Sequence, residues 1–119
     1  MAILVLMVGV PGSGKSTWIQ NNLTDKDVWV SRDAIRYNLL EEDDDYFAKE
    51  NEVIELFINK INNMLNKNFR YVYADATHLH PKGRAQLLNN LKIKPDAIYA
   101  VYIDTPLNIT LERNAQREG

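Results

Sequence analysis

The sequence has 119 residues, of which 45% are hydrophobic and 25% charged, so it fits one globular domain rather than a disordered, collagen-like or coiled-coil chain. It contains no cysteine, which excludes disulfides, zinc–thiolate sites, iron–sulfur clusters and thiol catalysis within this chain. The formal net charge of −2 argues against coating nucleic acid along many phosphates, but not against touching one end of a strand.

No apolar run reaches the ~18 residues that span a bilayer. The run at residues 2–8 has no basic residues before it and no small-residue cleavage site, so it does not resemble a signal peptide. We therefore expect a single domain over residues 1–119, in the cytoplasm, with no membrane partner.

The first third of the chain alternates strands with helices. Residues 2–8 form a continuous apolar run, typical of a strand buried on both faces of a parallel sheet. A helix is expected at about 15–23, a short strand at 28–30 and a helix at 32–40, with Ser31 or Asp33 available to cap that helix.

The acidic run 41–45 is expected to be a solvated loop. After it, apolar residues recur at spacings of three and four from Val53 to Leu65, which predicts an amphipathic helix. The remaining elements are a strand at 71–74 ending at Asp75, a helix at about 81–91 beginning with proline, a strand at 97–103 and a helix from 107 to about 116.

This alternation predicts an α/β fold with a mainly parallel sheet and helices on both faces. Ligands of such sheets bind outside the carboxyl ends of the strands. The residues that follow the strands are therefore the candidates for function.

Residues 9–16 match the phosphate-binding pattern GxxxxGK[ST] in full. Its glycines let backbone N–H groups surround phosphates, Lys15 supplies a cation for the β- and γ-phosphates, and the Ser16 hydroxyl completes a magnesium site. The alternative is a glycine-rich turn between strand and helix with no ligand. The predicted nucleotide-binding residues are Gly9, Pro11, Gly12, Ser13, Gly14, Lys15, Ser16 and Thr17.

Asp75 ends an apolar strand, as a Walker B carboxylate does, and is predicted to serve the magnesium ion with Ser16. It is also the kind of residue that occurs at an ordinary strand exit. Position 76 is alanine, which disfavours a motor ATPase with a glutamate base, and the chain has no NKxD sequence for reading guanine.

Asp33 follows the second strand and Arg36 lies three residues later, one helical turn away. The carboxylate is suited to accept the proton of an attacking hydroxyl, and the arginine to hold a substrate phosphate. A local ion pair at the start of a helix is the alternative.

Arg113 and Arg117 are spaced four residues apart, so on a helix they would clamp donor phosphates; cations near a helix C-terminus are the alternative. His78 and His80 are expected to make polar contacts rather than bind a metal. Trp18 and Trp29 are expected to pack between helix and sheet.

Together these residues resemble the 5′-hydroxyl kinase domain of the phage-type polynucleotide kinase family, in the P-loop kinase superfamily. Four blocks carry the resemblance: residues 9–18; Ser31-Arg32-Asp33 with Arg36; residues 75–81 with Arg84; and residues 104–106 with 111–114 and Arg117. The sequence departs from the family at Ala76, since the family has its aspartate directly before Thr77.

The resemblance implies a three-layer P-loop NTPase fold with strand order 2-3-1-4, and ATP and Mg²⁺ as cofactors. It implies that Asp33 is the general base, that Arg36 contacts the acceptor phosphate, and that Arg117, supported by Arg113, is a lid arginine on the donor phosphates. The lid region is expected to be short at the C-terminus.

The predicted function is an ATP-dependent kinase that transfers the γ-phosphate to a hydroxyl, most simply the 5′-OH end of a polynucleotide. Two alternatives stay open. One is a small-molecule kinase of the gluconate, adenylylsulfate or zeta-toxin kind, and the other is a non-catalytic ATP-binding module with an incomplete lid.

Overall fold

The N-terminal apolar run forms β1 (Ile3–Val8), which lies at the centre of the sheet. This computed structural model describes residues 2–9, 14–45, 48–76, 81–105 and 108–112. Within these ranges the strands form one sheet in the order β2-β3-β1-β4-β5. The other strands are β2 (Val28–Ser31), β3 (Tyr71–Ala76), β4 (Ala97–Thr105) and β5 (Asn108–Glu112).

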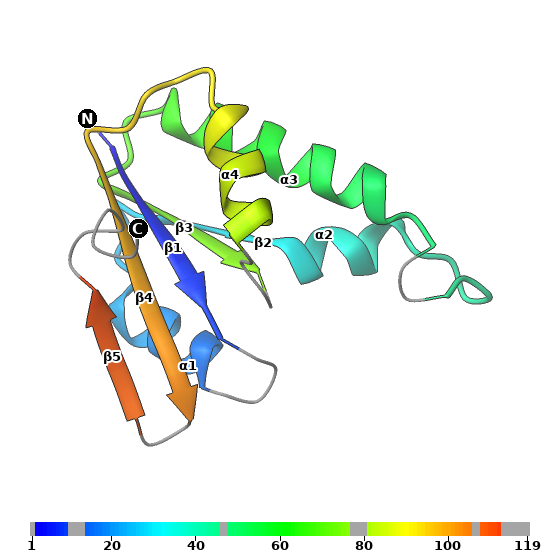
Figure 1. Cartoon of the computed structure of the whole chain (residues 1–119), viewed down its shortest axis with the longest axis horizontal. Coiled ribbons are helices and arrows are strands. Elements are labelled where there is room, and N and C mark those ends of the chain that lie inside the picture. The colour runs from blue at the N-terminus through cyan, green and yellow to red at the C-terminus, as the bar shows by residue number, and fades with distance from the viewer. Residues whose placement is uncertain (1, 10–13, 46–47, 77–80, 106–107, 113–119) are drawn as a thin grey trace.

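β1 pairs in parallel with β3 and β4, and β2 pairs in parallel with β3. The predicted strand order 2-3-1-4 is therefore confirmed. Figure 1 shows these strands pointing the same way, so that their carboxyl ends meet at one edge of the sheet.

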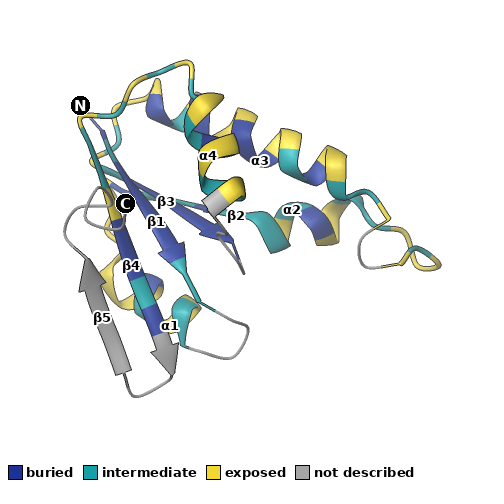
Figure 2. Cartoon of the chain, viewed as in Figure 1, coloured by how far each residue is buried: buried dark blue, intermediate teal, exposed yellow. Residues whose placement is uncertain are grey.

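Helices cover both faces of the sheet (Figure 1), as predicted. One face packs against α2 (Arg32–Leu39), α3 (Glu50–Leu65) and α4 (Pro81–Asn89), through buried residues such as Phe57, Ile61 and Leu87. The opposite face packs against α1 (Lys15–Asn22) through Ile19. Figure 2 shows the buried residues lining the strands and the inner sides of the helices.

The last predicted helix, at residues 107 to about 116, is wrong where the structure describes it, because Asn108–Glu112 is strand β5, antiparallel to β4. The sequence Asn-Ile-Thr-Leu-Glu alternates polar and apolar residues and includes two β-branched ones, a pattern that favours a strand. Pairing with β5 also satisfies the backbone groups along one side of β4.

Two helix starts that position the site are explained by their capping residues. Gly14 caps α1 with φ 94° and ψ 10°, a left-handed conformation that glycine adopts without steric cost. Ser31 caps α2, its side chain accepting a hydrogen bond from the Ala34 N–H at 3.1 Å, so Ser31 rather than Asp33 is the cap. None of the helices in the described ranges is long and apolar enough to cross a membrane.

Candidate functional site

The carboxyl edge of the sheet brings together three of the motifs found in the sequence. Gly9 follows β1, Asp33 follows β2 by two residues, and Asp75 lies one residue before the end of β3. Ser31 is paired with Asp75 across β2 and β3. Gly9, Asp33 and Asp75 therefore lie at one edge, as expected for a ligand site in a parallel sheet.

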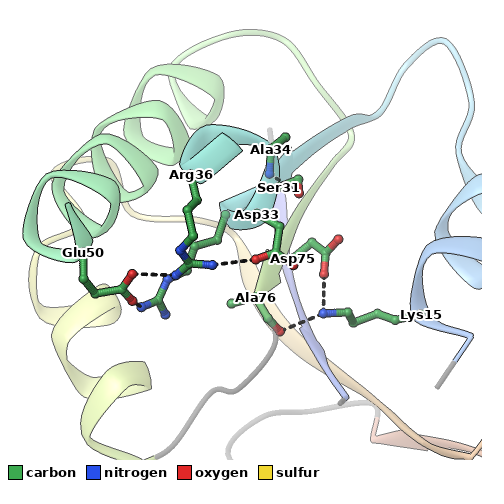
Figure 3. Close-up of polar contacts among 9 residues, drawn as sticks. Lys15, Ser31, Asp33, Ala34, Arg36, Glu50, Asp75 and Ala76 are labelled. Carbon is green, nitrogen blue, oxygen red and sulfur yellow. Dashed lines mark hydrogen bonds and ion pairs between the residues drawn. The ribbon is translucent and has the colours of Figure 1, made fainter. Parts of the chain in front are cut away.

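Lys15, the first residue of α1, makes an ion pair with Asp75 and a hydrogen bond with the end of β3 (Figure 3). Its Nζ lies 2.7 Å from Asp75 Oδ1 and donates to the Ala76 carbonyl oxygen at 3.0 Å. The exposed fractions of the Lys15 and Asp75 side chains are 10% and 7%, so the pair is nearly shielded from solvent. The lysine of the motif is thus held at the mouth of the site by the carboxylate of β3.

The second oxygen of Asp75 has a different partner. Trp29 Nε1 donates a hydrogen bond to Asp75 Oδ2 at 2.9 Å, across 46 residues of sequence. Trp29 also packs in the apolar cluster on the α1 side, and so does Trp18, as predicted for both. We call Lys15, Asp75 and Trp29 the Lys15 cluster.

A second ion-pair cluster joins α2 to the first residue of α3 (Figure 3). Arg36 Nη1 donates to Asp33 Oδ1 and Arg36 Nη2 donates to Glu50 Oε1, both at 2.6 Å, and Arg32 also pairs with Glu50. We call Arg32, Asp33, Arg36 and Glu50 the Arg36 cluster.

Arg36 and Asp33 differ in how far their side chains are exposed to solvent. Only 4% of the Arg36 side chain is exposed, whereas 43% of the Asp33 side chain is. The buried guanidinium therefore holds in place a carboxylate that is partly exposed to solvent. The alternative of a local ion pair between Asp33 and Arg36 is present, and it is compatible with a role of Asp33 as a base.

The two arginines set the ionisation of Glu50. Burial alone would raise the pKa of the Glu50 carboxyl, but hydrogen bonds from Arg36 and Arg32, and their positive charges, hold that pKa below its ordinary value. Glu50 is therefore ionised near neutral pH and pairs with both arginines.

The structure describes some of the other predicted site residues but not all of them. Ser16 and Thr17 lie exposed on the first turn of α1. Pro11, Gly12, Ser13, His78, His80, Arg113 and Arg117 lie outside the described residues. Arg84, from the third block of the resemblance, lies on α4 and donates from Nη1 to the Tyr102 hydroxyl at 2.6 Å.

The chemistry of the edge fits a magnesium ion bound with a nucleotide. The Ser16 hydroxyl and the Asp75 carboxylate are hard oxygen donors, which Mg²⁺ prefers. Among the described residues there is no group of three or more His, Cys, Asp or Glu side chains that would hold a metal alone. Phosphate and water oxygens would therefore complete the coordination.

Sequence reasoning missed Trp29 as a polar residue of the site, and it missed Glu50. Both make their contacts through tertiary structure, across 46 and 14 residues respectively. The only local signal for Glu50 is its position at the start of an amphipathic helix. Acidic residues are common there because they interact favourably with the helix dipole, so the position alone does not indicate a role in the site.

A separate cavity of about 420 Å³ lies between α3 and α4. It is lined mostly by polar and charged residues, together with two isoleucines: Asn51, Ile54, Glu55, Ile58, Asn59, Gln86, Asn90 and Lys92. None of the site residues predicted from the sequence lines this cavity.

Known proteins resemble this chain in sequence and in fold. A family model described as an AAA domain matches residues 4–119. The L-seryl-tRNA(Sec) kinase of Methanococcus maripaludis is 29% identical over 125 residues, which cover 97% of this chain and 46% of that protein. The chain thus spans about half the length of this curated relative.

Two solved structures share the fold. A Pnkp1/Rnl/Hen1 complex matches with a TM-score of 0.68 and 20% identity, over 96% of this chain and 45% of that chain. The APS kinase CysC of Mycobacterium tuberculosis, in a mutant form, matches with a TM-score of 0.57 and 17% identity, over 92% of this chain and 80% of that chain.

At these identities the structural matches bear on the fold alone, and they confirm the predicted P-loop NTPase fold. The family match covers nearly the whole chain, including both ion-pair clusters. The chain therefore belongs to the AAA domain family.

Proposed function

We propose that this chain is an ATP-dependent kinase domain that transfers the γ-phosphate of ATP to the 5′-hydroxyl end of a polynucleotide. The observation that carries the proposal is the pairing of two clusters at one sheet edge. The Lys15 cluster has the groups that bind a nucleoside triphosphate, and the Arg36 cluster presents a half-exposed carboxylate beside it.

On the donor side, Lys15 binds the β- and γ-phosphates, with the N-terminus of α1 behind it. Ser16 and Asp75 would hold Mg²⁺, which would neutralise charge on the transferred phosphoryl group. Arg117, with Arg113, is assigned to the donor phosphates by the resemblance, and both assignments belong to this proposal.

On the acceptor side, Asp33 orients the attacking hydroxyl and accepts its proton. Arg36 fixes the Asp33 carboxylate through the 2.6 Å hydrogen bond from Nη1. The acceptor-phosphate contact that the resemblance assigns to Arg36 requires the phosphate to reach a side chain that is 4% exposed. An acceptor phosphate would therefore have to approach beside Asp33 or share Arg36 with Glu50.

A second acceptor is favoured by one specific observation. The relative with 29% identity over 97% of this chain is described as an L-seryl-tRNA(Sec) kinase. A seryl hydroxyl carried on tRNA is also a primary alcohol next to nucleic acid, and the same base and phosphate-binding groups would serve it.

The test is to offer γ-labelled ATP and Mg²⁺ with 5′-OH DNA, 5′-OH RNA, seryl-tRNA and a set of small hydroxyl metabolites. We expect label on the 5′-OH oligonucleotides and none on matched oligonucleotides that already carry a 5′-phosphate. If only seryl-tRNA or only a metabolite is labelled, that molecule is the acceptor and the polynucleotide is not.

An Asp33→Asn variant tests the role of the base. We expect it to bind ATP as the wild type does and to lose transfer by at least about 100-fold, the usual range for a general base. Wild-type turnover by this variant would disprove the assignment of Asp33. ATP binding without transfer to any acceptor by the wild-type chain would favour a non-catalytic nucleotide-binding module.

A further inference from the structure

Trp29 reaches Asp75 diagonally across two paired strands. The register pairs Trp29 with Tyr73 and Ser31 with Asp75, so Trp29 and Asp75 are diagonal neighbours on the face of the sheet that α1 covers. Such neighbours lie within reach of a long aromatic side chain. The hydrogen bond from Trp29 Nε1 to Asp75 Oδ2, 2.9 Å long, spans this diagonal.

The two partners of Asp75 differ in what they can do when a nucleotide binds. Lys15 is a cation on a flexible stem, and its Nζ is 2.7 Å from Oδ1. Trp29 is a neutral donor whose ring is fixed by the apolar cluster of β1, β3 and α1. When phosphates attract Lys15, the ion pair must open, whereas the indole can stay where it is.

Asp75 cannot easily tolerate losing its partners, because the residue is only 6% exposed. A buried carboxylate oxygen needs a hydrogen-bond donor, and a donor that stays in place fixes the direction in which the carboxylate points. Trp29 stays on Oδ2, which leaves Oδ1 available when Lys15 moves away.

We propose that Trp29 is a positioning residue of the nucleotide site, whose indole N–H holds the Asp75 carboxylate in one orientation while Lys15 turns to the nucleotide. This role of Trp29 rests on one part of the proposed function, the binding of a nucleotide, and does not require phosphoryl transfer. Its consequence is a coupling: Mg²⁺ strengthens nucleotide binding through Asp75, and this strengthening depends on Trp29.

The experiment measures the affinity for the β,γ-imido analogue of ATP by calorimetry, with Mg²⁺ and with a chelator. The ratio of the two affinities is the coupling. In Trp29→Phe, which keeps an aromatic ring and removes the N–H, we expect the coupling to fall by about tenfold, as for the loss of one hydrogen bond to a charged group.

The matched control is Trp18→Phe. Trp18 packs in the same cluster, with its ring centroid 6.2 Å from that of Tyr73, so the change perturbs packing on the same face. We expect this variant to keep the wild-type coupling, and we expect Trp29→His, which retains a ring N–H, to recover part of it. Equal coupling in Trp29→Phe, Trp18→Phe and the wild type would overturn the proposal.

A second measurement holds even if Trp29→Phe does not fold. In ¹⁵N-labelled wild-type protein, the Trp29 indole N–H should be protected from hydrogen exchange both free and with the nucleotide analogue and Mg²⁺ bound. Loss of that protection on binding would show that the hydrogen bond breaks and would refute the positioning role. Absence of any nucleotide binding would instead refute the proposed function.

Discussion

Lys15 and Asp75 depend on each other for stability. With 10% and 7% of their side chains exposed, each charge relies on the other for compensation. Removing one partner of a buried ion pair typically costs about 3–5 kcal/mol, because the other charge stays buried. We expect Lys15→Met to lower the free energy of unfolding by about 3 kcal/mol in urea titrations, at the low end because Trp29 still holds Asp75.

Adding Asp75→Asn to the Lys15→Met chain should restore at least half of that loss, since no unpaired charge then remains. Lys60→Met is the control, because Lys60 is exposed on α3 and its removal should change stability by less than about 0.5 kcal/mol. A double variant less stable than Lys15→Met would show that the two charges are not coupled.

The sequence allows some residues of this edge to be predicted and not others. Lys15, Asp33, Arg36 and Asp75 stand out because each belongs to a local pattern beside a strand or at a helix start. Trp29 reads as a packing residue, because its N–H finds a partner only after β2 and β3 pair.

At the scale of elements, Glu50 ties the start of α3 to α2 through Arg36 and Arg32. The pKa of Glu50 in the folded chain lies below its ordinary value of 4.5, in spite of burial, because both arginines hydrogen-bond to the charged form. A lowered folded-state pKa means that this stabilisation is present above 4.5 and is lost as the pH falls through the folded-state value.

We therefore expect the unfolding free energy of the wild type to decline as the pH falls below 4.5, and the decline to be smaller in Glu50→Gln. Urea titrations at pH values from neutral to acidic measure the difference. Glu52→Gln is the matched control, because Glu52 is exposed one turn into the same helix. A decline in Glu50→Gln as steep as in the wild type and in the control would rule out the ion pairs of Glu50 as a source of this acid sensitivity.

Element types were predictable where the apolar pattern was long, as in β1 and α3, whose buried residues lie where the periodicity places them. The error at β5 has a physical reason. Five residues that alternate polar and apolar side chains favour a strand only when a neighbouring strand offers its edge, and β4 does so here. A local pattern carries no information about that edge.

At the scale of the whole molecule, the strand order was predictable from the resemblance and is consistent with the rule that crossovers between parallel strands pass over the faces of the sheet. The order places β1 between β3 and β4, so the end of β1 lies beside the end of β3, where Val8 pairs with Ala76. Lys15 and Asp75 are 60 residues apart in the sequence. They meet because β1, which precedes the helix of Lys15, pairs with β3, which contains Asp75, so their contact is a consequence of topology.

This arrangement predicts that the nucleotide stabilises the entire fold. Phosphates bound where we propose, at the start of α1 and at the end of β3, would hold together a helix and a sheet that exist only in the folded chain. A ligand at 100 times its dissociation constant adds about 2.7 kcal/mol to the unfolding free energy. For a domain of this size that gain corresponds to an increase in melting temperature of roughly 10 °C.

Thermal unfolding followed by circular dichroism, with and without saturating ATP and Mg²⁺, measures this increase. Lys15→Met should show little of it, because the cation that we propose binds the phosphates is missing, and Lys60→Met should match the wild type. An equal rise in all three proteins would mean that the nucleotide stabilises the chain at a place other than the carboxyl edge of the sheet. The variants thus separate binding at the Lys15 cluster from stabilisation by the ionic strength of added nucleotide, which would act on all three alike.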